Sequence, residues 1–86
     1  MKRQRNGRTL DRLVRAFADQ AAKNLAKWGN QDMETLCLAI AEETGELAQA
    51  ILQARHEGGD PDRIRQEAID LGALCAQMVK KFHDDN

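Results

Sequence analysis

Apolar residues recur at steps of three and four along most of the chain, which is the spacing of amphipathic helices. The first helix is predicted to begin at Thr9, whose hydroxyl can cap it, and to end near the turn residues 27–32. Within that turn, Gly29 favours a helix stop and Asp32 can cap the helix that follows. A helix, a short turn and a second helix are therefore expected in the first part of the chain.

The second helix is predicted over about Met33–Glu57, and the third opens at Asp60 and Pro61, a favourable cap and first-turn pair. Apolar residues form one stripe along each of the three helices. The stripes contain Leu10, Leu13, Val14, Phe17, Ala18, Ala21, Ala22 and Leu25 in the first helix, Leu36, Ile40, Leu47, Ile51 and Ala54 in the second, and Ile64, Ala68, Leu71, Cys75, Met78, Val79 and Phe82 in the third.

No strand pattern, repeat or long linker accompanies these helices, so the sequence predicts an all-α fold, an antiparallel bundle of about three main helices. We expect residues 9–83 to form one domain, residues 1–8 a flexible basic arm, and residues 84–86 a frayed end. Three helices bury only a modest core. Ile69 lies opposite the main stripe of the third helix, and Gly72 and Ala73 permit close helix approach. Homo-oligomerisation is therefore expected to complete the bundle; the alternative is a few exposed apolar side chains.

Composition narrows the class of protein. Four of the basic residues lie in the first eight positions, which leaves the rest of the chain acidic; they are Lys2, Arg3, Arg5 and Arg8. This arm is expected to be solvated rather than to bind nucleic acid. Cys37 and Cys75 fall within apolar helical patterns, so both are predicted to be reduced core residues. No run of about 18 uncharged apolar residues occurs, so a cytoplasmic protein without membrane partners is expected.

Carboxylates interrupt the second helix at Glu42, Glu43 and Glu46. Glu43 falls inside the apolar stripe and Glu46 lies about 60° to its side, so Glu43 should be at least partly buried. None of the three has a basic residue three or four positions away, although such partners are common on solvated helix surfaces. Ion pairs with basic residues on the same helix therefore do not account for these three acids.

The third helix adds Glu67 and Asp70, again one turn apart beside its apolar face. If the two helices fold back on each other at residues 58–59, Glu46 and Asp70 lie roughly 18 and 16 Å from the turn, and are therefore level. Glu43 would flank this pair on one helix and Glu67 on the other. Four converging negative charges need a counter-ion, and all-oxygen ligands suit magnesium, manganese or calcium. The alternative is that these acids only flank the core and reach water.

The acidic motifs resemble those of a known superfamily. "EETGE" at residues 42–46 and "EAID" at residues 67–70 are similar to the EExxE and ExxD motifs of the MazG-like all-α nucleoside triphosphate pyrophosphohydrolases, and "KWGNQ" at residues 27–31 extends the match upstream. The resemblance covers roughly residues 27–82 and is to the minimal, single-domain type. It implies a helical bundle that forms homodimers or homotetramers.

The resemblance also implies roles for individual residues. Glu43, Glu46, Glu67 and Asp70 would bind Mg²⁺, for which Mn²⁺ can substitute. Glu42 would be catalytic, by binding an additional metal ion or by orienting and deprotonating the attacking water. Candidate substrate-binding residues, each of which could instead be structural, are Lys27, Trp28, Gln31, Lys80 and Lys81.

The expected function is magnesium-dependent hydrolysis of ribo- or deoxyribonucleoside triphosphates to the monophosphate and pyrophosphate, as house-cleaning of the nucleotide pool. Phosphoribosyl-ATP pyrophosphohydrolase is an enzymatic alternative, because it shares the superfamily's acidic motifs. A helical interaction or nucleic-acid-binding module is an alternative of another class. A di-iron carboxylate bundle fits less well, because neither motif has the Glu-x-x-His form.

Overall fold

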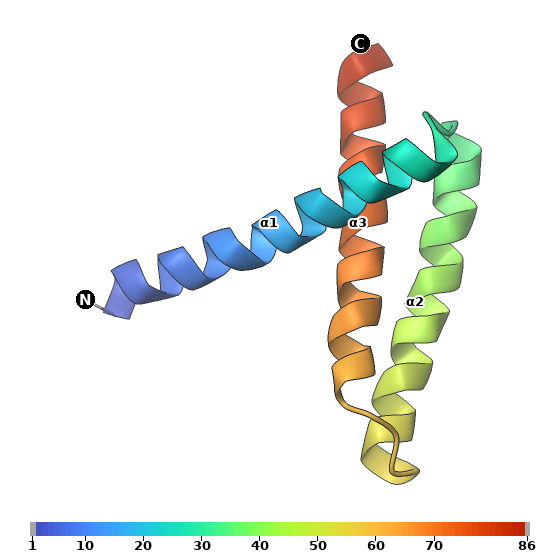
Figure 1. Cartoon of the computed structure of the whole chain (residues 1–86). Helices are drawn as coiled ribbons and strands as arrows, with labels where there is room; N and C mark the ends of the chain where they lie inside the picture. Colours follow the sequence, from blue (N-terminus) through green and yellow to red (C-terminus); the bar gives the residue numbers. More distant parts are fainter. Residues whose placement is uncertain (1, 86) are drawn as a thin grey trace.

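The computed structural model describes the backbone of residues 2–85 and the side chains of residues 7–85. It contains three helices, α1 (Lys2–Trp28), α2 (Met33–His56) and α3 (Asp62–Asp85). No strand occurs in the described part of the chain, which confirms the predicted all-α fold. Helices α2 and α3 run antiparallel as a hairpin, and α1 crosses α3 and projects beyond it toward the N-terminus (Figure 1).

The turn between α1 and α2 forms where the sequence predicts it. Gly29 adopts a positive φ of 75° and donates its backbone N–H to the carbonyl of Leu25 at 2.9 Å. The side chain of Asp32 accepts the backbone N–H of Thr35 at 2.8 Å and caps α2. That hydrogen bond lowers the pKa of the Asp32 carboxyl. Local cap chemistry therefore sets both helix ends.

The hairpin turn joins α2 to α3 through a second glycine with left-handed backbone, Gly58, at a φ of 70°. Two backbone N–H groups, those of Glu57 and Gly59, donate to the carbonyl of Gln53 at 2.9 Å each. Asp60 then accepts the backbone N–H of Asp62 at 3.0 Å at the start of α3. The predicted break and cap are confirmed, and α2 ends at His56.

The predicted start of the first helix at Thr9 is wrong. Helix α1 begins at Lys2, so the backbone of residues 2–8 is helical and continuous with the rest of α1. Lysine, arginine and glutamine favour helix, and the single Gly7 costs about 1 kcal/mol, too little to break it. At the other end, α3 runs on to Asp85, where residues 84–86 were expected to fray. Met1 and Asn86 lie outside the described residues.

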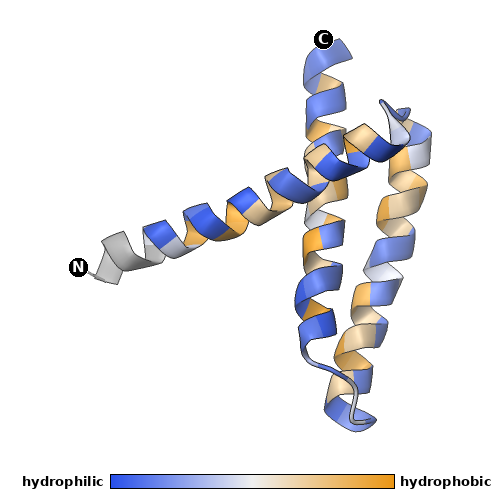
Figure 2. Ribbon diagram, in the orientation of Figure 1, coloured by the Kyte–Doolittle hydropathy of each residue, from blue (hydrophilic) through white to orange (hydrophobic). Residues whose placement is uncertain are grey.

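Helix α3 packs against both other helices, and the core between them is small. Apolar residues recur as stripes along each helix (Figure 2). The buried apolar side chains are Ala21, Leu36, Ala50 and Ala73. Gly72 lies where α1 crosses α3, and a Cβ atom there would stand 2.6 Å from Cδ1 of Phe17. The close helix approach predicted at Gly72 therefore occurs within one chain, between α1 and α3.

Several apolar side chains remain exposed, and the predicted burial of the cysteines is wrong. Cys37 and Cys75 are both exposed. Each helix is covered by its neighbours on one side only, so apolar residues at the edges of a stripe are exposed. Leu38 and Val79 are 73% and 68% exposed. Among the described residues, no helix is long and apolar enough to cross a membrane.

Candidate metal centre and adjoining pocket

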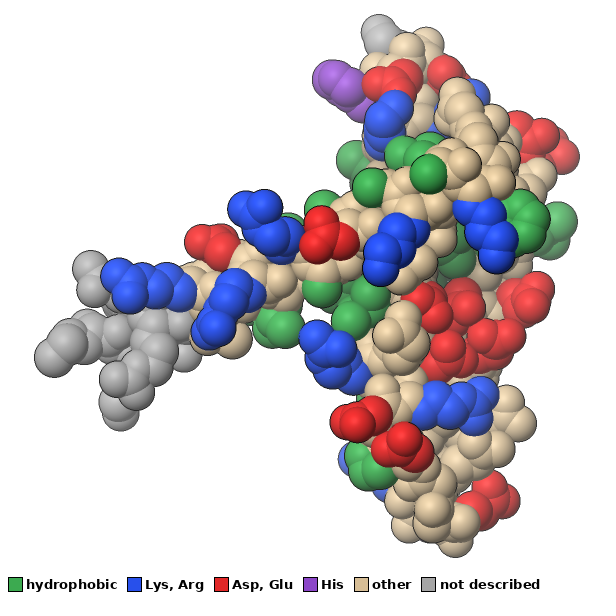
Figure 3. All heavy atoms as spheres, viewed as in Figure 1, with side chains coloured by type: hydrophobic (Ala, Val, Ile, Leu, Met, Phe, Trp, Pro, Cys, Tyr) green, Lys and Arg blue, Asp and Glu red, His purple; other side chains and the backbone are tan. Residues whose placement is uncertain are grey.

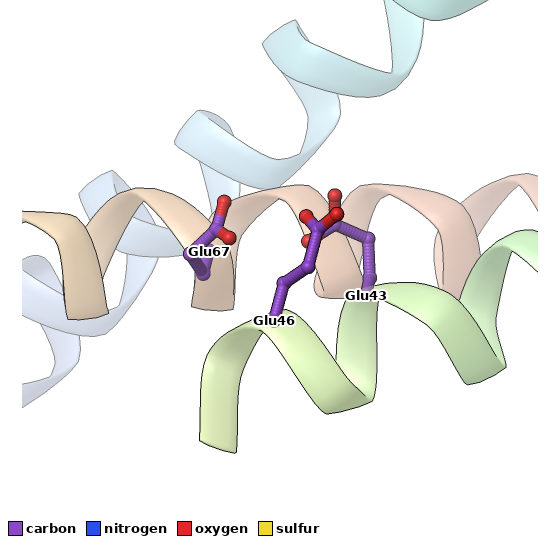
Figure 4. Close-up of side chains that lie close together, drawn as sticks. All are labelled: Glu43, Glu46 and Glu67. Carbon is purple, nitrogen blue, oxygen red and sulfur yellow. The ribbon is translucent and has the colours of Figure 1, made fainter. Parts of the chain in front are cut away.

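Three glutamates meet across the α2–α3 hairpin. Glu43 and Glu46 are one turn apart on α2, which places them on the same side of the helix, and Glu67 faces them from α3 (Figure 4). One carboxylate oxygen of each lies within 4.8 Å of the others. Acidic side chains gather over the hairpin on the surface in Figure 3. The structure thus brings together three of the four predicted metal ligands.

The glutamate cluster is poorly solvated, and one of its carboxylate oxygens is buried without a hydrogen-bond partner. Glu67 is only 9% exposed, and Glu43 is half-buried, as predicted from its position in the apolar stripe. Oε2 of Glu43 is buried and has no hydrogen-bond partner, the one such atom among the described side chains. Leaving a buried polar atom unsatisfied costs about 1–3 kcal/mol, and more for a charged group. A cation at this point would supply the missing partner.

The electrostatics of the cluster also favour a cation. Burial raises the pKa of Glu43 from 4.5 to about 7, assisted by the neighbouring carboxyl of Glu46 and by the negative charges of Glu67 and Asp70. Burial and the charge of Glu46 likewise raise the pKa of Glu67, and Arg63 opposes this rise. The cluster therefore disfavours its own full ionisation at neutral pH.

Arg63 is a weak counter-ion for this cluster. Its Nη2 lies 3.8 Å from Oε2 of Glu67, the pairing that the sequence allows one turn along α3. Its Nη1 donates to Oε1 of Gln53 at 2.6 Å, so the guanidinium is shared with the α2 side of the hairpin. One partly exposed arginine leaves most of the negative charge uncompensated.

Asp70, the fourth predicted ligand, is not part of the tight group of three. Its Oδ1 accepts a hydrogen bond from Nε2 of Gln66 at 2.9 Å. Asp70 is nevertheless close enough for its charge to raise the pKa of both Glu43 and Glu67. Glu42, the predicted catalytic residue, lies on the exposed side of α2, next to the cluster in sequence but outside it.

A cavity of about 390 Å³ adjoins the cluster and is bounded by all three helices. This volume is within the usual range of small-ligand sites. Glu43 and Asp70 line it together with Trp28 and Gln31, so two of the predicted substrate-binding residues share one cavity with two of the predicted ligands. The full lining consists of Gln20, Asn24, Trp28, Gln31, Ala39, Glu43, Asp70 and Leu74.

The three candidate lysines do not line this cavity. Nζ of Lys27 lies over the Trp28 ring, 4.9 Å from its centroid. Lys80 pairs with Asp84, and Lys81 pairs with Asp85 at 3.4 Å, each one turn along α3. The structure thus places Lys80 and Lys81 in helix-surface ion pairs, and it places Lys27 beside the pocket tryptophan.

Sequence reasoning missed a row of amide side chains beside the pocket. Nε2 of Gln20 donates to Oδ1 of Asn24 at 3.1 Å, and Nδ2 of Asn24 donates to Oε1 of Gln77 at 2.8 Å. Gln77 is 4% exposed. The available signal was the placement of polar residues against apolar stripes: Gln20 and Asn24 flank Ala21, and Gln77 precedes Met78.

Comparisons of the chain with protein-family models, with curated proteins and with solved structures found no match.

Proposed function

We propose that this protein is a magnesium-dependent nucleoside triphosphate pyrophosphohydrolase, which cleaves the bond between the α- and β-phosphates. The observation that carries the proposal is the convergence of Glu43, Glu46 and Glu67 around a buried oxygen that lacks a partner. The resemblance of the acidic motifs to the MazG-like enzymes supplies the reaction. Removal of unwanted nucleotides in the cytoplasm would be the corresponding role.

The donor set fits a hard divalent cation. All three clustered side chains offer carboxylate oxygens, and neither His56 nor His83 belongs to the group. Carboxylates from two rigid helices, with Asp70 nearby, are ligands of the kind that Mg²⁺ and Mn²⁺ take. When bound, the cation would neutralise phosphate oxygens and acidify a coordinated water molecule.

The remaining roles belong to side chains of this chain. The exposed carboxylate of Glu42, adjacent to Glu43, would orient the attacking water and accept its proton. The indole of Trp28 would stack on the nucleobase in the cavity that Glu43 also lines, and Gln31 would contact the same end of the nucleotide. In this arrangement the base and the scissile phosphates occupy one continuous site.

Self-association forms part of the proposal. Exposed apolar residues such as Leu38 and Val79 would be covered in a homodimer or homotetramer. Neighbouring copies would also be a source of cations for the triphosphate, because the cavity lining contains no lysine or arginine.

The direct test is a panel of ribo- and deoxyribonucleoside triphosphates, with phosphoribosyl-ATP as a competing substrate. Pyrophosphate release should require Mg²⁺ or Mn²⁺ and should cease with a chelator. Glu43→Gln and Glu67→Gln should each lower turnover by at least about 100-fold. Glu34→Gln, which removes an exposed acid in the first turn of α2, is the matched control and should keep full activity. Absence of pyrophosphate with every substrate would refute the proposal.

Metal binding gives a second readout that does not depend on turnover. Calorimetric titration with Mn²⁺ should detect a site in the wild-type protein and in Glu34→Gln. The site should be lost in Glu43→Gln and in Glu67→Gln, because each removes a charged ligand. Equal Mn²⁺ affinity in all four proteins would place the metal elsewhere.

A further inference from the structure

The amide row beside the pocket has a defined direction. Each of its two hydrogen bonds joins the NH₂ group of one side chain to the oxygen of the next, from Gln20 through Asn24 to Gln77. The last member is buried on α3, while the first two lie on α1 and line the cavity. The row thus connects a buried side chain of α3 with two residues that line the cavity.

An isolated amide side chain can rotate by half a turn and exchange its donor for its acceptor. In this row such a rotation would break a hydrogen bond. Because Oε1 of Gln77 accepts from Nδ2 of Asn24, Oδ1 of Asn24 is left to face Gln20, which donates Nε2 to it. The orientations of the three amides are therefore coupled, so the buried Gln77 influences both amides at the cavity.

Two polar groups remain after these hydrogen bonds are counted. An amide NH₂ carries two hydrogens and Asn24 uses one of them for Gln77, so a second donor hydrogen is left. Gln20 uses its NH₂ group toward Asn24, so its Oε1 is left as an acceptor. Gln20 and Asn24 lie one helical turn apart and line the same cavity as Trp28, so the row offers one acceptor and one donor beside that cavity.

We propose that Gln77, Asn24 and Gln20 form a base-reading relay, which selects a planar nucleobase edge with a hydrogen-bond donor beside an acceptor. Gln20 and Asn24 are the specificity-determining residues, and Gln77 is a positioning residue that acts through Asn24. The inference rests on the proposed function for the identity of the ligand as a nucleotide. Beyond that function, the inference specifies that the base is recognised and names the residues that recognise it.

A purely structural role makes a different prediction. If the amides only join α1 to α3, their replacement should lower stability and leave the preference among bases unchanged. If they read the base, replacement should reduce discrimination between base edges in a protein that is still folded. Binding measurements without metal can separate these outcomes, because they need neither turnover nor the glutamate cluster.

Trp28 is the only tryptophan of the chain and lines the cavity, so its fluorescence reports occupancy. Nucleosides would be titrated in matched pairs of similar bulk. N6-methyladenosine retains a donor that N6,N6-dimethyladenosine lacks, and 5-methyluridine retains a donor that 3-methyluridine lacks. In the wild-type protein, at least one pair should show about tenfold weaker binding of the member without the donor.

Two variants test the relay. Gln20→Met removes the free acceptor that a donor on the base would use, and Gln77→Met removes the buried acceptor that orients Asn24. Both should reduce the tenfold discrimination to about threefold or less, with the helical circular dichroism spectrum retained. Gln49→Met, at an exposed glutamine of α2, should leave it unchanged. Equal binding within both pairs in the wild-type protein, or full discrimination in both variants, would overturn the relay.

The outcomes also separate the relay from the proposed function. Base discrimination without pyrophosphate release from any triphosphate would leave the relay standing and would refute the enzymatic proposal. Pyrophosphate release combined with equal binding within both nucleoside pairs would support the enzymatic proposal and would refute the relay.

Discussion

Replacing Glu43 by glutamine should stabilise the metal-free protein while abolishing its proposed activity. The substitution keeps the shape of the side chain and removes a charge from a position where Oε2 has no hydrogen-bond partner. Burial and the neighbouring acids raise the pKa of Glu43 from 4.5 to about 7 in the folded chain. Between these values the native state binds more protons than the unfolded state. Stability therefore falls as the pH rises through this window, and the full penalty applies above it.

The size of the effect follows from the pKa. At ~1.4 kcal/mol per pKa unit, a rise from 4.5 to about 7 corresponds to at most about 3.5 kcal/mol. Glu43 is half-buried and titrates together with neighbouring carboxylates, so its own share is about 1–3 kcal/mol. For a domain of this size, each kcal/mol moves the melting temperature by roughly 4–8 °C. The gain should shrink to less than about 1 kcal/mol at about pH 5, where Glu43 is protonated in the folded state.

Urea unfolding followed by helical circular dichroism, with a chelator present and at about pH 5 and pH 8, measures this difference. Glu34→Gln removes an exposed acid from the same helix and should change stability by no more than about 0.5 kcal/mol at either pH. A Glu43→Gln protein that is less stable than wild type at the higher pH would refute the reasoning. An equal gain at both pH values would also refute it, because the effect would then not arise from ionisation.

Three other expectations test separate parts of the account. At about pH 8, Mg²⁺ at 100 times its dissociation constant should stabilise the wild-type protein by ~2.7 kcal/mol in a thermal melt, and Glu67→Gln should lose most of this gain. Gly72→Ala should cost about 1–3 kcal/mol in urea unfolding, because its Cβ would lie 2.6 Å from the Phe17 ring, and Phe17→Leu should relieve part of the cost. Light scattering should give the mass of two or four chains, and Leu38→Lys combined with Val79→Lys should shift it toward one; a wild-type monomer would contradict self-association.

The helices could be predicted from the sequence wherever their ends depend on local chemistry. Gly29 and Asp32 stop one helix and start the next through hydrogen bonds within a few residues. The start of α1 could not be predicted in this way, because the polar residues before Thr9 favour helix and contain no strong stop. The exposure of Cys37 and Cys75 depends on how much of each stripe the neighbouring helices cover, which periodicity alone does not specify.

The glutamate cluster could also be predicted in outline. The position of Glu43 in the apolar stripe indicated burial, and the hairpin glycines indicated that Glu67 would face α2. The sequence does not specify the side-chain conformations, and these determine which three acids approach most closely. In the structure, Asp70 accepts a hydrogen bond from Gln66 and lies outside the tight group. The amide row was missed because the hydrogen bond from Asn24 to Gln77 joins residues far apart in the sequence and forms only where α1 packs on α3.

The central claim is that the three clustered glutamates support metal-dependent cleavage between the α- and β-phosphates. Phosphorus NMR of the reaction with each triphosphate, in the presence of Mg²⁺, tests this claim most directly. We predict equal amounts of nucleoside monophosphate and pyrophosphate from the wild-type protein, formed at least about 100-fold more slowly by Glu43→Gln and by Glu67→Gln. Nucleoside diphosphate with orthophosphate, no product from any triphosphate, or unchanged turnover in both variants would contradict it.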